Sequence, residues 1–223
     1  MLQMPPTIAA LYRPASDREV CSRSFGVVKF PRNPAAHGWE ERRGTLEDQA
    51  IFGPLRDFEC ACGKYRGTKY KGMICDGCGV KVTTTASRRQ RFGHIDLPAP
   101  TVHPLGQGTE RLSAIPVLPA VFRESRGGQV LAAHYDGLVR LALADSVETL
   151  AAGLGRLMEV LLPIATAAHE WRLQDAENLA WGLGLERRTD SFHDTCRYCG
   201  YPLEGLDVPT CPGCGNKLGD VVS

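Results

Sequence analysis

Four closely spaced pairs of cysteines constrain the fold of this 223-residue chain more than any other feature. Cys21 is the only one of the nine cysteines that lies outside a pair. Cysteine pairs separated by one or two residues favour metal binding over disulfide bonds in a cytosolic chain, because thiols stay reduced in the cytosol. The paired residues are Cys60, Cys62, Cys75 and Cys78 in the first quartet, and Cys196, Cys199, Cys211 and Cys214 in the second.

Each quartet is predicted to bind one structural zinc ion, which makes two ions per chain. The first quartet reads Cys-x-Cys, twelve residues, Cys-x-x-Cys, and the second reads Cys-x-x-Cys, eleven residues, Cys-x-x-Cys. Four thiolates enclose an ion tetrahedrally and leave no position for water, so such sites stabilise a fold rather than catalyse a reaction. Gly63, Gly77 and Gly79 are suited to the tight turns beside the first quartet. An iron centre and free thiols are the alternatives; zinc is favoured because the sequence shows no redox partner.

A basic segment surrounds the first quartet. From Cys60 to Arg91, eight basic residues accompany one acidic residue, Asp76, although the whole chain has a net charge of only +1. Tyr65, Tyr70 and Phe92 are interleaved with these bases, a pattern that suits contact with phosphates and packing against bases or sugars. A solvated basic face over a small zinc core fits the same pattern equally well. The candidate nucleic-acid contacts are Lys64, Arg66, Lys69, Lys71, Arg88, Arg89 and Arg91.

The second quartet has no comparable charge. Arg197 and Lys217 are balanced by Glu204 and Asp207. The spacing of the second quartet is that of a zinc ribbon. Such a module is compatible with a C-terminal cap without a partner and equally with a protein-docking role.

A leucine pattern predicts a helical hairpin between the two quartets. Leucines and a valine recur at alternating spacings of four and three, which is typical of one buried helix face. Pro163 is expected to end this helix and to separate it from a second one. A plain pair of packing helices fits the periodicity as well. The first helix is defined by Leu143, Val147, Leu150, Leu154, Leu157 and Leu161, and the second by Ile164, Ala168, Trp171, Leu179 and Leu183.

The predicted fold class is α+β, with two small zinc ribbons joined by the helical hairpin. No apolar run approaches the ~20 residues of a membrane helix, and the N-terminus does not resemble a secretory signal. We therefore expect a cytoplasmic protein with no membrane association. The expected segments are a flexible tail over 1–17, a zinc-binding domain over 18–104, a connector (105–114) and hairpin within 105–185, and a linker with the second ribbon over 186–223.

Several short motifs around the first quartet closely resemble the N-terminal zinc-binding region of the bacterial RNA polymerase β′ subunit. Besides the quartet and its spacing, they are Ser24-Phe25-Gly26, Ile51-Phe52-Gly53-Pro54 and Gly93-His94-Ile95. A weaker resemblance resumes over 115–183, where Leu173-Gln174-Asp175-Ala176 is similar to part of the second clamp helix of that family.

The resemblance implies that Cys60, Cys62, Cys75 and Cys78 match the family's zinc ligands one for one. It also implies a place in the polymerase clamp, beside upstream DNA and the RNA exit path, and a hairpin related to the clamp helices on which sigma factors dock. Residues 136–180, however, contain seven acids and three bases. The first clamp helix of that family is rich in arginine, so a sigma surface that evolved for a basic partner would meet unfavourable charge here. Sigma is therefore expected to bind this hairpin weakly.

The expected function is that of a non-catalytic, zinc-binding, β′-like protein that contacts nucleic acid, either DNA or RNA, or the transcription machinery. Polymerases of this family hold magnesium on clustered aspartates, and no Asp-x-Asp occurs here, so no activity is expected of this chain alone. One alternative is a split or truncated β′ subunit that is active only in the assembled polymerase. Another is a decoy of the clamp that binds sigma or the polymerase core.

Overall fold

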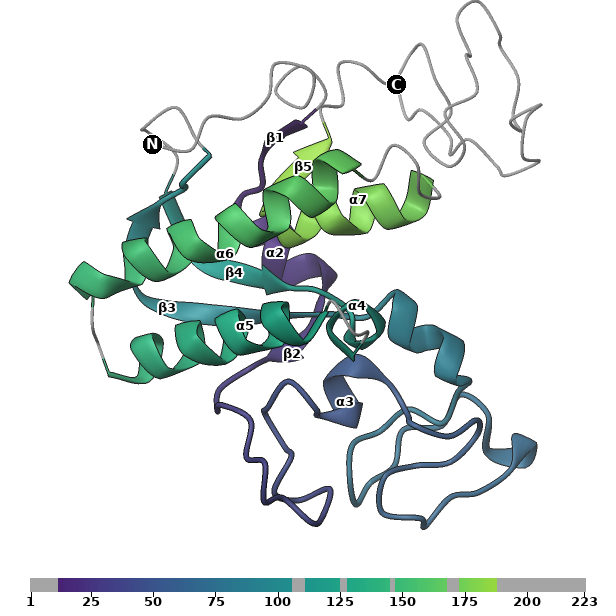
Figure 1. Cartoon of the computed structure of the whole chain (residues 1–223). Helices are drawn as coiled ribbons and strands as arrows, with labels where there is room; N and C mark the ends of the chain where they lie inside the picture. The colour runs from purple at the N-terminus through teal and green to yellow at the C-terminus, as the bar shows by residue number, and fades with distance from the viewer. Residues whose placement is uncertain (1–11, 106–110, 125–127, 145–146, 168–172, 188–223) are drawn as a thin grey trace, which may run out of the picture.

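The computed structural model describes residues 12–105, 111–124, 128–144, 147–167 and 173–187. Figure 1 shows a layered part, in which helices pack on a small sheet, and an irregular part made of loops below it. The fold class is α+β, as predicted. Cys196–Cys214 lies outside the described residues, so the two-ribbon arrangement is not tested.

A three-stranded sheet forms the centre of the layered part. Its order is β2 (Ser24–Val27), β3 (Phe92–Val102) and β4 (Arg111–Val117). β2 runs parallel to β3, and β3 runs antiparallel to β4, with Ile95 opposite Ile115. The register of β3 and β4 shifts between Asp96 and Thr101. Pro98 and Pro100 lie in that interval, and they interrupt the ladder because proline has no N–H to donate.

The sheet joins chain segments on both sides of the predicted boundary at residue 104. Residues 111–114, which we expected to be part of a connector, belong to β4. Leu46, Phe52 and Ile95 share one buried cluster with Leu118 and Leu154. A single core therefore holds the sheet, the helices and the segment that leads into the first quartet.

The structure of the N-terminal segment differs from the predicted flexible tail. Tyr12–Pro14 is not part of a flexible tail but forms strand β1, which pairs antiparallel with β5 (Leu185–Arg187). Pro14 is compatible with this strand because a two-stranded ribbon leaves half of its N–H positions unpaired. Prolines in a sequence thus mark an edge strand as readily as a loop.

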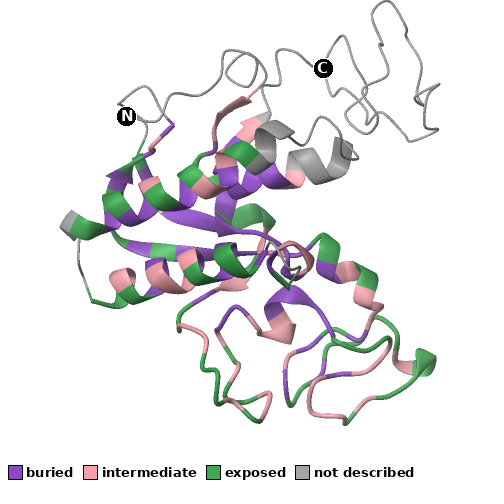
Figure 2. Cartoon of the chain, in the orientation of Figure 1, coloured by how far each residue is buried: buried purple, intermediate pink, exposed green. Residues whose placement is uncertain are grey.

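Helices α5 (Gly128–Leu143), α6 (Val147–Ala167) and α7 (Leu173–Gly182) pack on the sheet. The leucine pattern is confirmed within α6, where Leu150, Leu154, Leu157 and Leu161 are fully buried. Leu143 belongs to α5 instead and is 58% exposed. Figure 2 shows the resulting division between the buried inner faces of the helices and their exposed outer faces.

The position of the hairpin turn was predicted wrongly. Pro163 lies inside α6, which continues to Ala167, and α6 packs antiparallel to α5 and also contacts α7. Pro163 removes one N–H from the helix, and the carbonyl left without it belongs to Glu159. Both residues are exposed, so water can solvate that carbonyl and the helix need not end.

Gly153 permits the close approach of α5 and α6. A Cβ at this position would lie 2.8 Å from Cδ1 of Leu141 and 3.1 Å from Cδ2 of Leu138. A side chain at this position would force Leu138 and Leu141 to shift. None of the described helices has the length and apolar character of a transmembrane segment.

Helix α2 (Asp17–Arg23) begins with a capping box that also ties it to β1. Ser16 Oγ accepts the N–H of Glu19, and the Glu19 carboxylate accepts the N–H of Ser16 at 2.8 Å. Both Glu19 oxygens also accept from the Arg13 guanidinium, at 2.6 and 3.0 Å. Arg13 and, to a lesser extent, Ser16 thereby lower the pKa of Glu19 to about 2, against the opposing effect of burial.

We predict that Glu19→Gln lowers the free energy of unfolding by about 0.5–1 kcal/mol at pH 7, the range of a partly exposed ion pair. Because the folded-state pKa is depressed, the stabilising effect is complete above the ordinary pKa of 4.5 and is lost as the pH falls towards 2. Urea titrations at pH 7 and pH 3 should show the difference from wild type shrinking at pH 3. Glu159→Gln, at an exposed site on α6, is the control, and an equal effect of both variants would contradict the role of the Arg13–Glu19 ion pair.

Candidate metal centre and its basic face

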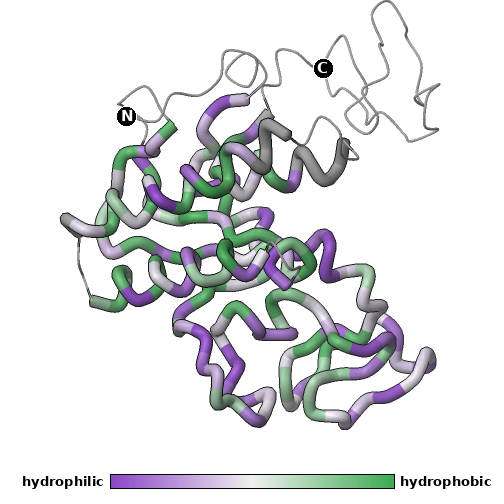
Figure 3. The backbone as a smooth tube through the Cα atoms, viewed as in Figure 1, coloured by the Kyte–Doolittle hydropathy of each residue, from purple (hydrophilic) through white to green (hydrophobic). Residues whose placement is uncertain are grey.

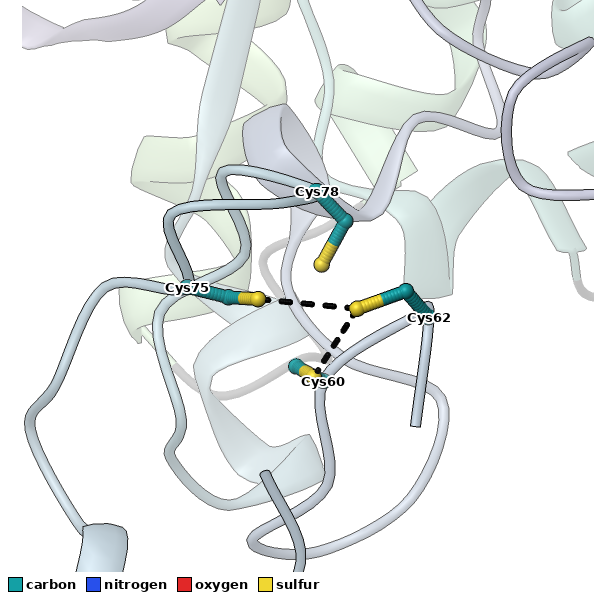
Figure 4. Close-up of side chains that lie close together, drawn as sticks. All are labelled: Cys60, Cys62, Cys75 and Cys78. Atoms are coloured by element: carbon teal, nitrogen blue, oxygen red, sulfur yellow. Dashed lines mark hydrogen bonds between the residues drawn. The ribbon is translucent and has the colours of Figure 1, made fainter. Parts of the chain in front are cut away.

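The first cysteine quartet converges on one point. Figure 4 shows all four side chains directed towards a common centre. The four sulfur atoms lie within 4.8 Å of one another, with 3.6 Å between Cys60 and Cys62 and 3.5 Å between Cys62 and Cys75. In a tetrahedral zinc site with Zn–S bonds of about 2.3 Å, sulfurs are separated by roughly 3.8 Å. The quartet therefore has the dimensions of a zinc site.

Two short hairpins supply the cysteines. In the first, the N–H of Cys60 donates to Tyr65 O at 3.1 Å, and in the second the N–H of Cys75 donates to Val80 O at 3.0 Å. Gly63 and Gly79 have φ values of 76° and 73°, a left-handed conformation that glycine adopts without strain. Gly77, also expected to shape a turn, is not among the positive-φ glycines.

The local environment favours a thiolate at Cys75 but not at Cys62. The N–H of Lys64 lowers the pKa of Cys62, but burial and the neighbouring thiols outweigh it and raise that pKa to about 12. Cys60, Cys75 and Cys78 are buried, and the N–H of Tyr65 lies 3.2 Å from Cys60 Sγ. Burial raises the pKa of Cys75, but the N–H groups of Cys78 and Gly77 and the neighbouring thiols outweigh it, so that the pKa falls to about 7. Hydrogen bonds to sulfur stabilise the charged form that a metal requires.

The hydrophobic support of this centre is small. Val80 and Val82 are buried beside the cysteines, and Trp39, Phe58 and Tyr70 are partly buried against them. This cluster is separate from the main core. Hydrophilic and hydrophobic residues alternate over short distances along these loops (Figure 3). Segments with so small a hydrophobic core are commonly stabilised by a bound metal ion.

The loops around the quartet, residues 58–83, are called the ribbon below. Two of the predicted nucleic-acid contacts form ion pairs within it. Lys64 Nζ lies 2.6 Å from Asp76 Oδ2, and Arg66 Nε lies 3.3 Å from Glu59 Oε1. All four side chains are at least partly exposed, and such pairs contribute little to stability. Lys64 and Arg66 remain accessible to solvent.

Two other predicted contacts are buried. Arg88 donates to Gly53 O at 2.9 Å and also to Glu124. Arg91 is only 9% exposed and lies over the Phe25 ring, with 4.2 Å between the guanidinium carbon and the ring centroid. The sequence gives no sign of this, because a buried arginine and a surface arginine look alike in a basic run.

The remaining candidates, Lys69, Lys71 and Arg89, are exposed. Lys81, which the prediction of contacts omitted, is exposed as well. No ion pair of these four residues is found within the described part of the chain. These four exposed bases without a carboxylate partner are together called the basic face below, although Lys69 lies over the Tyr70 ring and the carbonyl oxygen of Arg89 accepts a hydrogen bond from Asn178 of α7.

The tyrosines are less available than the sequence suggested. Tyr65 and Tyr70 pack against each other with ring centroids 5.0 Å apart. Lys64 lies 5.5 Å from the centroid of the Tyr65 ring, and Lys69 lies 4.8 Å from that of Tyr70. Phe92 packs edge-on against Trp181, away from the quartet. The rings that appeared suited to stacking on bases therefore have partners inside the protein.

Comparison with curated proteins finds an 89-residue match in the β′ subunits of DNA-directed RNA polymerases. The identity is 53% for Rhodopirellula baltica, 51% for Aquifex aeolicus and 48% for Lactobacillus delbrueckii subsp. bulgaricus. No protein-family model matches the chain. The match covers 40% of this chain and only 6% to 7% of those relatives. Over two fifths of its length, therefore, this chain is homologous to the RNA polymerase β′ subunit.

Proposed function

We propose that this chain is a non-catalytic, zinc-binding, β′-like protein that contacts nucleic acid and the transcription machinery. The observation that carries the proposal is the largely buried four-thiol centre in a basic segment, in a chain partly homologous to β′ subunits. In this proposal the homologous stretch is the zinc-binding region of the clamp, and the two quartets each hold one zinc ion. The metal has a structural role, because four sulfur ligands leave no open coordination position.

The proposed nucleic-acid contacts are the exposed bases of the ribbon. Lys69, Lys71 and Arg89 are free to bind phosphates, and Lys64 and Arg66 can exchange their carboxylate partners for phosphate oxygens. The role of Arg88 and Arg91 is instead to hold the ribbon on the core, because both are buried. Contacts of this kind position a protein on nucleic acid without reading its sequence.

Two alternatives concern the protein partner. A split β′ subunit would assemble into the polymerase and complete its activity, whereas a decoy would bind sigma or the core and exclude the normal clamp. Purification of the tagged chain from native cells tests the split-subunit reading. Stoichiometric recovery with the other polymerase subunits, and no full-length β′ in the complex, would favour it over a separate β′-like protein.

We predict that binding to duplex DNA weakens steeply with salt and that the basic face determines this dependence. Each phosphate contact contributes about −0.9 to the slope of log K against log salt. The triple variant Lys69→Glu, Lys71→Glu and Arg89→Glu should reduce the magnitude of the slope by up to about 2.7. Fluorescence anisotropy between 50 and 300 mM salt measures both slopes. The Debye length shortens by a factor of about 2.4 over this range.

The matched control reverses three exposed bases on other elements, namely Arg18, Arg140 and Arg156. It changes the net charge by the same amount and should leave the slope unchanged. Equal effects of the two triple variants would show that only net charge matters, and a wild-type curve that is indifferent to salt would overturn the nucleic-acid proposal.

A further inference from the structure

We infer that Met73 and Ile74, at the second zinc hairpin, form an apolar contact site for the bases or sugars of a bound nucleic acid. The inference rests on the proposed function and adds residues to it. Met73 is 45% exposed and Ile74 is 67% exposed, although both are large apolar side chains. They precede the ligand Cys75 directly and lie in the same ribbon as the free lysines.

The backbone holds this pair rigidly. The N–H of Met73 donates to Tyr70 O at 3.1 Å, and the N–H of Val82 donates to Met73 O at 2.8 Å. Ile74 forms an antiparallel bridge with Lys81. Directly opposite residues in such a pair project from the same side of the ribbon. An exposed isoleucine is thus fixed next to an exposed lysine.

Charge identifies the class of partner. Lys81 is exposed opposite Ile74, Lys71 is exposed two residues before Met73 in sequence, and the nearest acid in sequence, Asp76, is paired with Lys64. An apolar site bordered by free lysines is complementary to a ligand with an anionic backbone and apolar faces. Nucleic acids have this chemistry, and proteins that bind them do insert methionine or isoleucine against bases beside cationic side chains.

The packing of the aromatic rings strengthens the inference. Tyr65 and Tyr70 contact each other and their neighbouring lysines, so stacking on a base would require these contacts to break. Met73 and Ile74 need no such rearrangement, because their exposed surface is already free. The apolar part of nucleic-acid binding is therefore assigned to the aliphatic pair rather than to the tyrosines.

The test separates the apolar contact from the electrostatic one. Met73→Ser combined with Ile74→Thr should reduce affinity about tenfold at every salt concentration and leave the salt slope unchanged, because the lysines remain. The probes are a 20-mer DNA duplex and a single-stranded RNA 20-mer, and the one that shows the loss identifies the ligand. Val130→Thr with Leu143→Ser, two exposed apolar residues of α5, is the control. Zinc content of each variant confirms an intact ribbon.

The outcomes distinguish this inference from the function on which it rests. If wild type binds with a steep salt slope and the Met73/Ile74 variant binds equally well to both probes, the inference is wrong and the proposed function stands. If wild type binds neither probe, both are wrong. The variant could also keep its nucleic-acid affinity but lose a polymerase subunit that copurifies with wild type. That result would assign the pair to a protein contact and overturn the inference.

Discussion

Removal of zinc from the first quartet is expected to unfold the ribbon around Cys60–Cys78 and to leave the sheet and helices folded. The ribbon has its own small hydrophobic cluster, built on Val80 and Val82 around the cysteines. Structural zinc contributes an apparent free energy of about 10–16 kcal/mol to small thiolate domains at pH 7. The few buried side chains of this cluster cannot replace that contribution. The main core contains no cysteine of the quartet and should survive.

Cys75→Ser tests this expectation in the full chain. Hydrogen exchange should show loss of protection in the loops around residues 58–83, while α5 and α6 keep theirs, and elemental analysis should show one zinc ion fewer than in wild type. Wild type should contain two ions if the second quartet also binds zinc. Cys21→Ser is the matched control, because Cys21 is exposed and lies outside the cluster. Retention of a full complement of zinc by Cys75→Ser would contradict the assignment of the ligands.

The first quartet could be predicted from the sequence because its signal is local. Cys60 and Cys62 lie on one hairpin and Cys75 and Cys78 on another, and the spacing within each pair already fixes which thiols can meet. The turn at Gly63 follows from the same local pattern. Only the packing of one hairpin against the other could not be predicted from the sequence. This packing brings the four sulfurs within 4.8 Å of one another.

The errors arose where contacts distant in sequence, or exposure to solvent, override a local signal. Pro14 was expected to disrupt regular structure, yet its strand pairs with residues more than 160 positions away in sequence. Pro163 was expected to end a helix, yet solvent exposure makes the missing hydrogen bond tolerable. Arg88 and Arg91 were assigned to phosphates because they belong to a basic run, yet Gly53, Glu124 and Phe25 surround them. None of these partners is adjacent in sequence.

Arg123 should be among the most sensitive residues of the main core. It lies at the end of α4 (Ala120–Glu124) and is only 3% exposed. Its Nε donates to Leu118 O at 2.8 Å and its Nη1 to Leu46 O at 2.9 Å, while the guanidinium carbon lies 4.2 Å from the centroid of Phe52. Burial lowers the pKa of Arg123 to about 10, so it remains charged at pH 7. One cation thus connects segments from both predicted domains.

We predict that Arg123→Met lowers the free energy of unfolding by about 3 kcal/mol or more. Methionine fills much of the volume but leaves two buried carbonyls, those of Leu46 and Leu118, without a donor, and each costs about 1–3 kcal/mol. Chemical denaturation at pH 7 measures the loss, and Arg140→Met, at an exposed position of α5, should change stability by less than about 0.5 kcal/mol.

Hydrogen exchange on the same variant decides whether residues 18–104 and 105–185 are separate domains. If the shared core makes them one cooperative unit, Arg123→Met lowers the opening free energies of the β3 amides and of the α5 and α6 amides by the same amount, because all of them report one transition. The amides of the ribbon are left out of this comparison, because the ribbon has its own hydrophobic cluster. A loss of protection confined to α5 and α6 would restore the boundary at residue 104, and unchanged protection throughout would show that Leu46 and Leu118 find other donors.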